Sequence, residues 1–216
     1  MKAEIISAKD KNCAKIAAQF MEKGEIIIYP TETSYGIGAD IENKKALQKI
    51  YEIKKRPIEK QLIYLVSSAA MARKYAFITA DHEKLIKAFM PNRQTHKRTD
   101  AKGVDSWASV LPLTLVAKGK KTEEFAFRIS SNKLANEIVS LLGKPIASTS
   151  ANFTGDPPLY KIRDVFRHFQ GQVSLIIDAG SLRQRRPSTV VDLFNSINIR
   201  REGSITKQQI TKSLHG

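Results

Sequence analysis

The sequence predicts an α/β protein, and three observations point to that class. Of its 216 residues, 42% are hydrophobic and 26% are charged, close to an ordinary globular protein and enough for a sizeable core. Short β-branched runs, such as residues 25–30 and 62–66, alternate with amphipathic segments along the chain. There is no repeat of fixed period and no linker rich in proline, glycine and serine. The chain is therefore expected to form one domain, residues 1–216.

The first elements are expected from apolar spacing and from the residues that interrupt it. Residues 9–23 place apolar side chains on one helical face, and Gly24 ends that helix. Residues 25–30 predict a buried strand, followed by a polar loop at 31–38. Residues 43–55 predict a lysine-rich amphipathic helix that Pro57 ends.

The remaining elements follow from the same patterns. Further strands are expected at residues 62–66, 113–117, 125–129, 145–150, 174–178, 189–193 and 197–201. Further helices are expected over 67–90 in two parts, with Ser67 and Ser68 as possible caps, over 132–142 and 161–169, and from about Thr206. The polar stretch 91–103 breaks the pattern and is expected to be a long exposed loop.

Charge and residue counts restrict the function classes. Thirty-six Lys+Arg against 21 Asp+Glu leave a net charge of +15, which suits nucleic acid, nucleotide phosphates or an acidic surface. Solvated lysines spread evenly over the surface would explain the same net charge without an anionic partner. Cys13 is the only cysteine, so no intramolecular disulfide forms, and the four histidines lack metal-ligand spacing, so no metal site is expected in the protein. No apolar run of about 20 residues spans a membrane, and a cytoplasmic protein is expected.

Three polar turns beside predicted strands are candidate binding sites. They are residues 30–36, rich in hydroxyls; residues 54–60, which carry several cations around Pro57; and residues 148–152, with sequence Ser-Thr-Ser-Ala-Asn. Strand ends in open α/β sheets offer free backbone groups to ligands. Each turn alone is also explained locally, as a connecting loop, as cations at a helix C-terminus or as a turn favoured by Ser and Asn. The P-loop, dinucleotide-binding and nucleophile-elbow motifs are missing, which excludes those enzyme classes.

Taken together, these turns resemble the YrdC/TsaC family. Residues 29–38 are similar to its opening motif, residues 54–62 to its Lys-x-Arg-Pro motif, and residues 145–152 to its Ser-Thr-Ser-Ala-Asn signature. Two closing elements, Pro187–Asp192 and Arg201–Gly203, follow in the family's order. The resemblance spans about residues 5–205. It departs from the family at residues 92–111, which correspond to a polar insertion of roughly 20 residues, and at Gln61 and Leu65.

The resemblance implies an open twisted mixed sheet with flanking helices around a concave basic cleft. It also implies a nucleotidyltransferase that converts L-threonine, bicarbonate and ATP, with Mg²⁺, into threonylcarbamoyl-AMP and pyrophosphate. Downstream transfer proteins would pass the threonylcarbamoyl group to position 37 of tRNA, and contact with tRNA is expected. This chemistry needs alignment and charge neutralisation, so no catalytic protein nucleophile is expected.

Positions matching the family motifs supply the expected site residues. ATP is assigned to Lys54, Arg56, Lys60, Ser148, Ser150, Asn152, Ser188 and Arg201. Threonine is assigned to Thr31, Thr33 and Arg128. Two alternatives stay open: a non-catalytic RNA-binding module of this fold, which the low aromatic content of 7% disfavours, and a carbamoyl-adenylate domain of the hydrogenase-maturation type.

Overall fold

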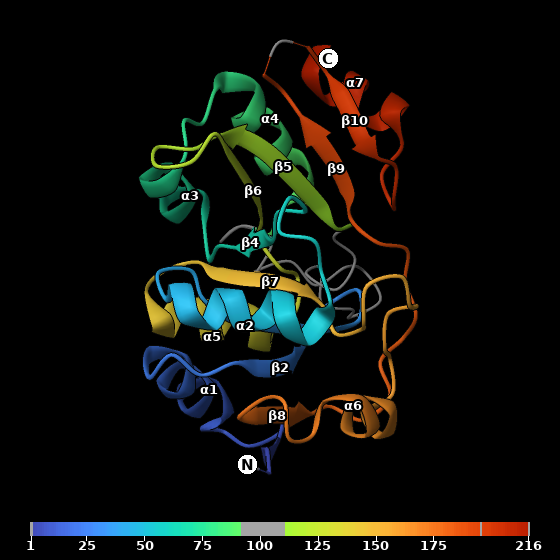
Figure 1. Ribbon diagram of the computed structural model, residues 1–216. Helices are drawn as coiled ribbons and strands as arrows, with labels where there is room; N and C mark the ends of the chain where they lie inside the picture. Colours follow the sequence, from blue (N-terminus) through green and yellow to red (C-terminus); the bar gives the residue numbers. More distant parts are fainter. Residues whose placement is uncertain (1, 92–110, 195, 216) are drawn as a thin grey trace.

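A ten-stranded mixed sheet with helices on both faces forms the framework (Figure 1). The computed structural model describes residues 2–91, 111–194 and 196–215. The strands are β1 (Glu4–Ser7), β2 (Ile27–Pro30), β3 (Tyr35–Asp40), β4 (Ile63–Leu65), β5 (Leu113–Lys118), β6 (Glu124–Arg128), β7 (Ile146–Ser150), β8 (Leu175–Asp178), β9 (Thr189–Asp192) and β10 (Asn198–Arg201). The helices are α1 (Cys13–Glu22), α2 (Lys44–Lys54), α3 (Ala69–Tyr75), α4 (Ala80–Phe89), α5 (Lys133–Leu142), α6 (Ile162–Phe169) and α7 (Lys207–His215).

The strand order is β1-β8-β2-β3-β7-β4-β6-β5-β9-β10, with parallel and antiparallel neighbours. The predicted α/β class and the open mixed sheet are therefore confirmed. The short strand β4 joins the two parts of the sheet: it pairs with β7 on one side and with β6 on the other. Below and above it in Figure 1 lie a half built on β1, β8, β2, β3 and β7 and a half built on β6, β5, β9 and β10.

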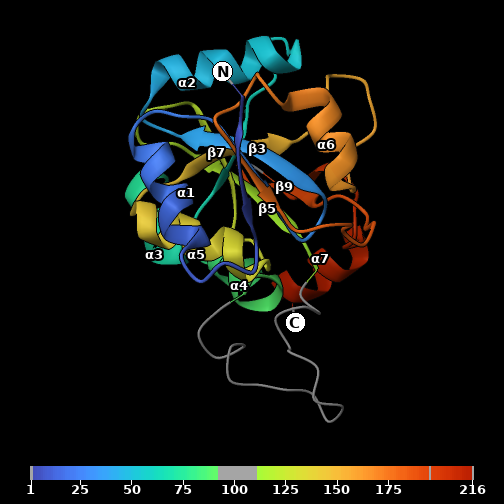
Figure 2. The same ribbon diagram turned by 90° about the horizontal axis from the view of Figure 1, so that it is seen from below.

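Two apolar layers cover the sheet unequally. The larger layer joins side chains of α1, α3, α4, α5 and α7 to one face of both halves. The smaller layer joins α2 and α6 to β2, β3, β7 and β8, and within the described residues it includes none from β5, β6, β9 or β10. Figure 2 shows α2 and α6 on one side of the sheet and α1, α3, α4, α5 and α7 on the other. One face of the second half is thus left without a helical layer in the described part of the chain.

Two strands were not predicted. The sequence analysis gave no element at Glu4–Ser7, which forms β1 at the sheet edge, and it assigned residues 31–38 to a loop. Only residues 31–34 are loop, since β3 begins at Tyr35 and pairs with both β2 and β7. Gly36 and Gly38 hid this strand, and close packing explains Gly38: a Cβ there would lie 2.8 Å from Ile146 Cγ2 and 2.9 Å from the Ala147 carbonyl.

Helix α2 ends at Lys54, before Pro57, which was predicted to end it. Lys55 adopts the left-handed conformation at φ 49°, and its amide donates to the carbonyl of Glu52, while the Arg56 amide donates to that of Tyr51. Ser68 caps α3, as predicted, by accepting from the Met71 amide at 3.2 Å. The expected insertion at 92–111 lies, except for Leu111, outside the described residues. Among the described helices, none combines the length and apolarity that a bilayer crossing requires.

Candidate functional site

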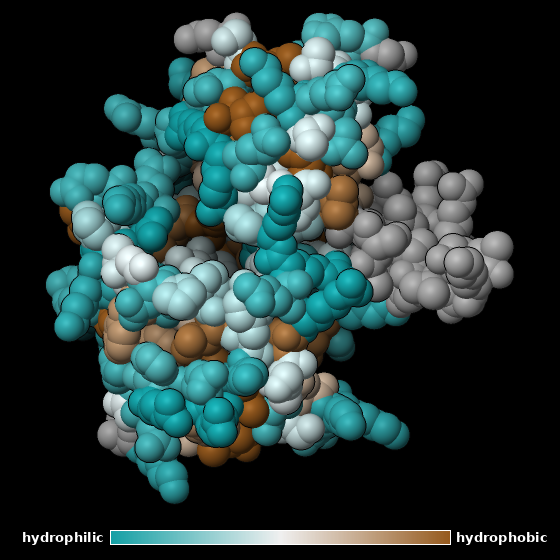
Figure 3. Space-filling model, turned by 90° about the vertical axis from the view of Figure 1, so that its right-hand side faces the viewer, coloured by the Kyte–Doolittle hydropathy of each residue, from teal (hydrophilic) through white to brown (hydrophobic). Residues whose placement is uncertain are grey.

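A cavity of about 690 Å³ lies where the two halves of the sheet meet. One wall comes from the loop after β2, the start of β3 and the end of β7; the opposite wall comes from β6, the segment before β9 and the end of β10. Figure 3 shows the surface hollowed between the upper and lower parts of the molecule. Five arginines line the cavity, namely Arg56, Arg128, Arg185, Arg186 and Arg201. No carboxylate appears among the described residues that line it, so the site is built for anions.

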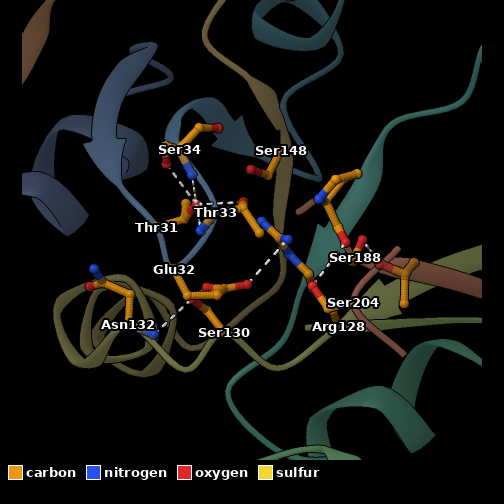
Figure 4. Close-up of polar contacts among 12 residues, drawn as sticks. Thr31, Glu32, Thr33, Ser34, Arg128, Ser130, Asn132, Ser148, Ser188 and Ser204 are labelled. Carbon is orange, nitrogen blue, oxygen red and sulfur yellow. Dashed lines mark hydrogen bonds and ion pairs between the residues drawn. The ribbon is translucent and has the colours of Figure 1, made fainter. Parts of the chain in front are cut away.

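The loop between β2 and β3 presents Thr31 and Thr33 to the cavity. Thr31 is buried, and its hydroxyl donates to the Ser34 carbonyl at 2.7 Å and lies 3.1 Å from the Thr33 hydroxyl. The Thr31 amide also donates to the Ser34 carbonyl at 3.0 Å. These bonds fix the turn, as Figure 4 shows, so both predicted threonine-site hydroxyls stand on a preformed wall.

The end of β7 brings Ser148 and Ser150 to the same wall. Strand pairing causes this, because Ser150 lies opposite Gly36 and Ser148 opposite Gly38. The buried Tyr29 hydroxyl donates to Ser148 Oγ at 2.7 Å, and burial raises the pKa of Tyr29, so the phenol stays protonated at neutral pH. Ser148 therefore has a fixed donor behind it and faces the cavity with its own hydroxyl.

Lys54 and Asn152, both predicted to bind ATP, are not among the described residues that line the cavity. Lys54 is only 2% exposed, and its ammonium donates to the carbonyls of Ser150 and Asn152. The Asn152 amide group donates to the carbonyls of Phe153 and Asp156 at 2.8 and 2.7 Å. The polar groups of both side chains are engaged in hydrogen bonds that hold the turn after β7 against the end of α2.

Arg56 lines the cavity, whereas Lys60 does not. The Arg56 guanidinium donates through Nε to the Lys60 carbonyl at 2.8 Å and through Nη2 to the Gln61 carbonyl at 2.9 Å. Neutral oxygens thus fix its direction, and no ion pair with another described residue compensates its charge. The Lys60 side chain is exposed to solvent, and the contact of Lys60 with Arg56 is made by its backbone carbonyl.

Arg128 lies at the end of β6 on the face without a helical layer, next to Phe127, which packs in the larger core. It is 9% exposed and forms an ion pair with Glu32, Nη1 to Oε1 at 3.2 Å. Its Nε is buried and has no hydrogen-bond partner among the described residues.

Ser188 and Arg201 form the far wall as a connected pair. Arg201 donates through Nε to the Ser188 carbonyl at 3.0 Å and through Nη2 to the Ser188 hydroxyl at 2.9 Å. Arg128 lines the same cavity, and burial, followed by the like charge of Arg128, lowers the pKa of Arg201. The structure therefore brings together Thr31, Thr33, Arg56, Arg128, Ser148, Ser150, Ser188 and Arg201.

Several lining residues escaped the sequence analysis. They include Tyr160, Gln184, Arg185 and Arg186. Residues 183–187, Arg-Gln-Arg-Arg-Pro, repeat the pattern of cations before a proline that drew attention to residues 54–57, and this signal was available in the sequence. Glu32 was also missed, because its partner Arg128 is 96 positions away in the chain and only folding joins them.

Comparisons with known proteins agree with this geometry. The model of the Sua5/YciO/YrdC family, described as telomere recombination, matches residues 19–203. A threonylcarbamoyl-AMP synthase of Photobacterium profundum is 31% identical over 189 residues, 83% of this chain and 94% of that protein. One of Pseudoalteromonas translucida is 29% identical over 86% of this chain and 96% of its own length.

Solved structures show the same fold. Pyrococcus abyssi Sua5, complexed with L-threonine, superposes with a TM-score of 0.83 at 28% identity. This chain is covered completely in that match but spans only 61% of the Sua5 chain. Escherichia coli YciO gives a TM-score of 0.77 at 24% identity over 97% of this chain and 98% of its own, a likeness of fold.

Proposed function

Because this chain belongs to the Sua5/YciO/YrdC family, we propose that it is a threonylcarbamoyl-AMP synthase, a nucleotidyltransferase acting on L-threonine, bicarbonate and ATP. Its product would serve modification of position 37 in tRNA, through proteins that transfer the threonylcarbamoyl group in the cytoplasm. Relatives of similar length carry that name, and the related Sua5 binds L-threonine in its crystal structure.

One observation of this structure supports the proposal most directly: two kinds of anion site share one cavity. Arg56 and Arg201 are oriented by neutral oxygens and keep their full charge for phosphates. Arg128 stands beside the Thr31–Ser34 turn, already balanced by a carboxylate, which suits the single carboxylate of an amino acid. A cavity of about 690 Å³ lies in the range expected of small-molecule sites.

The reaction requires positioning rather than a protein nucleophile. The threonine nitrogen bonds to the carbon of bicarbonate, with loss of water, and gives a carbamate. A carbamate oxygen then attacks the α-phosphorus of ATP, the bond to the β-phosphate breaks, and pyrophosphate leaves. Holding the two substrates in line and neutralising charge on the phosphates supplies the rate enhancement.

The eight predicted residues that line the cavity each have a role in this scheme. Arg56 and Arg201 hold phosphates, and Ser188 closes the nucleotide side through Arg201. Ser148 and Ser150 donate to the nucleotide or to the reacting carboxylate. Thr31, Thr33 and Arg128 hold threonine. Lys54 and Asn152 support this wall from behind.

Mg²⁺ is proposed to enter with ATP. The described residues contain no group of three His, Cys, Asp or Glu side chains able to hold a metal, and the Glu32 carboxylate is already paired with Arg128. Magnesium commonly keeps water ligands and is bound through substrate phosphates, so this donor set fits an ion carried by the triphosphate. Its chemistry would be to neutralise the phosphate oxygens.

The test is an assay of pyrophosphate release. Protein incubated with Mg²⁺-ATP, bicarbonate and labelled threonine is expected to release pyrophosphate only when threonine is present and to form labelled threonylcarbamoyl-AMP. Omission of bicarbonate is the matched control. Absence of threonine-dependent release, combined with tight binding of tRNA, would instead establish the non-catalytic RNA-binding alternative.

A further inference from the structure

We propose that Glu32 is a positioning residue that fixes the Arg128 guanidinium and balances its charge. Arg128 then binds the threonine carboxylate and does not attract the phosphates of ATP. The inference rests on the proposed function and concerns a residue behind the cavity wall. Glu32 is not among the residues that line the cavity, and its side chain is only 4% exposed. It therefore acts through Arg128.

The Glu32 carboxylate is held at both oxygens. Oε1 lies 3.2 Å from Arg128 Nη1, and Oε2 accepts a hydrogen bond from the Ser130 hydroxyl. Figure 4 shows the Glu32 side chain extending from the Thr31–Ser34 turn to Ser130, with the Arg128 guanidinium approaching it from the other side. A buried carboxylate held in this way has one orientation, and it imposes that orientation on the guanidinium.

The contact is anchored to a helix. Ser130 Oγ accepts from the Asn132 amide at 3.1 Å, and the Asn132 side chain caps α5 by accepting from the Ala135 amide at 3.1 Å. The chain of contacts therefore runs from the start of α5 through Ser130 and Glu32 to Arg128. Because α5 packs in the larger core, the position of the guanidinium is set by the fold rather than by a free side chain.

Arg128 keeps a donor in reserve. Glu32 engages Nη1, whereas Nε is buried and lacks a hydrogen-bond partner in the part of the chain that the structure describes. The Nε edge of a guanidinium belongs to the planar fork that receives carboxylates. A buried unpaired donor is costly and calls for a partner. A carboxylate-bearing substrate in the cavity that Arg128, Thr31 and Thr33 line would supply one.

Charge separates Arg128 from its neighbours. Arg56 donates to carbonyls, and Arg201 donates to a carbonyl and a hydroxyl, so both remain full cations. Arg128 is paired with a carboxylate at 3.2 Å. A triphosphate is attracted more strongly to the two uncompensated cations. The Glu32–Arg128 pair is close to neutral, so it attracts phosphates weakly but can still bind the carboxylate of a zwitterionic amino acid. Glu32 thereby determines which substrate binds to Arg128.

The test replaces Glu32 by Gln, which keeps the side-chain size and an oxygen acceptor but removes the charge. We expect the KM for threonine to rise by about tenfold or more, because a charge-assisted contact that orients the guanidinium is lost, while the KM for ATP stays within about twofold. We also expect pyrophosphate and sulfate to become competitive inhibitors against threonine, because the charge of Arg128 is then free. A merely structural role produces no new competition of this kind.

Glu25→Gln is the matched control, since Glu25 likewise accepts from a serine hydroxyl, that of Ser174, at a place remote from the cavity lining. Its threonine KM should equal that of the wild type. Ser130→Ala keeps both charges and removes only the anchor, so a smaller rise confined to threonine is expected, and it serves if Glu32→Gln does not fold. In an Arg128→Met background, Glu32→Gln should change the threonine KM no further.

The outcomes are distinguishable. Wild-type activity with an unchanged threonine KM in both Glu32→Gln and Ser130→Ala overturns the positioning role and leaves the proposed function intact. A rise in the KM for ATP equal to that for threonine also overturns it. A wild-type protein that neither binds threonine in calorimetry nor releases pyrophosphate overturns the proposed function, and the inference with it.

Discussion

At the scale of single residues, the direction of a side chain decides whether a residue lines the cavity or supports its wall from behind. Lys54 and Arg56 are two positions apart, yet Lys54 is buried beneath the turn after β7 and Arg56 lines the cavity. The motif indicated both. The sequence provides no measure of which side chain points inward, because that depends on the left-handed residue Lys55 between them and on contacts with carbonyls about 100 positions away. A similar limit applies to Asn152.

Replacing Lys54 by Met is expected to destabilise the protein by about 2–4 kcal/mol, because the carbonyls of Ser150 and Asn152 lose their buried donor. The penalty should grow with pH. Burial, and then the like charge of Arg56, lower the pKa of Lys54 from 10.5 to about 8. Between those values the unfolded chain binds more protons than the folded one, so the free energy of unfolding rises with pH by up to about 1.4 kcal/mol per pH unit.

Urea unfolding of wild type and Lys54→Met at pH 7, 8 and 9 measures this difference. Taking the difference cancels titrations common to both proteins, such as that of Cys13, whose pKa burial raises to about 11. The exposed Lys49 on the same helix supplies the control, and Lys49→Met should show only a small penalty. A Lys54→Met penalty that falls between pH 8 and 9 contradicts the prediction.

Arg56 and Lys60 allow a comparison within one turn. Arg56→Ala should weaken ATP binding by about tenfold or more, since a charged donor to phosphate contributes roughly 1.5–3 kcal/mol, and should leave threonine binding within about twofold. Lys60→Ala should change neither, because its exposed ammonium does not line the cavity and the carbonyl that Arg56 contacts is retained. The KM values for both substrates decide between them; equal effects of the two variants would refute the assignment.

At the scale of elements, most helices and strands followed from apolar periodicity, and the exceptions have physical causes. The edge strand β1 is exposed or half-buried throughout, so it shows no core-facing run of buried residues. Strand β3 is buried at every residue, but its two glycines mimic a loop. Gly38 is required by the approach of β7, a contact between segments more than 100 residues apart that no local pattern reveals.

The two glycines of β3 should respond differently to Ala. At Gly38 the new methyl meets the Ala147 carbonyl at 2.9 Å and Ile146 Cγ2 at 2.8 Å, so the β3–β7 pairing must shift and stability should fall by about 1–3 kcal/mol. At Gly36 the nearest atoms are Thr31 Cγ2 at 3.2 Å and Ser148 Oγ at 3.5 Å, on the cavity wall. Gly36→Ala should therefore retain most stability and lose activity. Thermal melting and initial rates measured on both variants test this, and the reverse pattern would count against it.

At the scale of the whole molecule, the cleft results from unequal covering of one sheet. Helices α2 and α6 pack only over the β8–β2–β3–β7 half, so side chains at the end of β6 and around β9 and β10 meet the opposite wall across open space. The alternation along β6 places Phe127 in the core and Arg128 toward that space. The class was predictable from the alternation of strand and helix patterns, and the concave basic cleft from the family resemblance. The location of the uncovered face depends on which helices pack where.

The net charge of +15 makes a last prediction about the two substrates. A multiply charged nucleotide is attracted by the whole positive field, while zwitterionic threonine has no net charge and depends on short-range contacts with Arg128 and the Thr31–Ser34 turn. Salt screens the long-range part, since the Debye length falls from about 10 Å at 0.1 M toward about 3 Å at 1 M. Raising NaCl from 50 to 400 mM at constant Mg²⁺ should therefore increase the KM for ATP several-fold and change that for threonine by less than about twofold. Equal increases for both substrates would show that the arginines of the cavity do not divide their work as proposed.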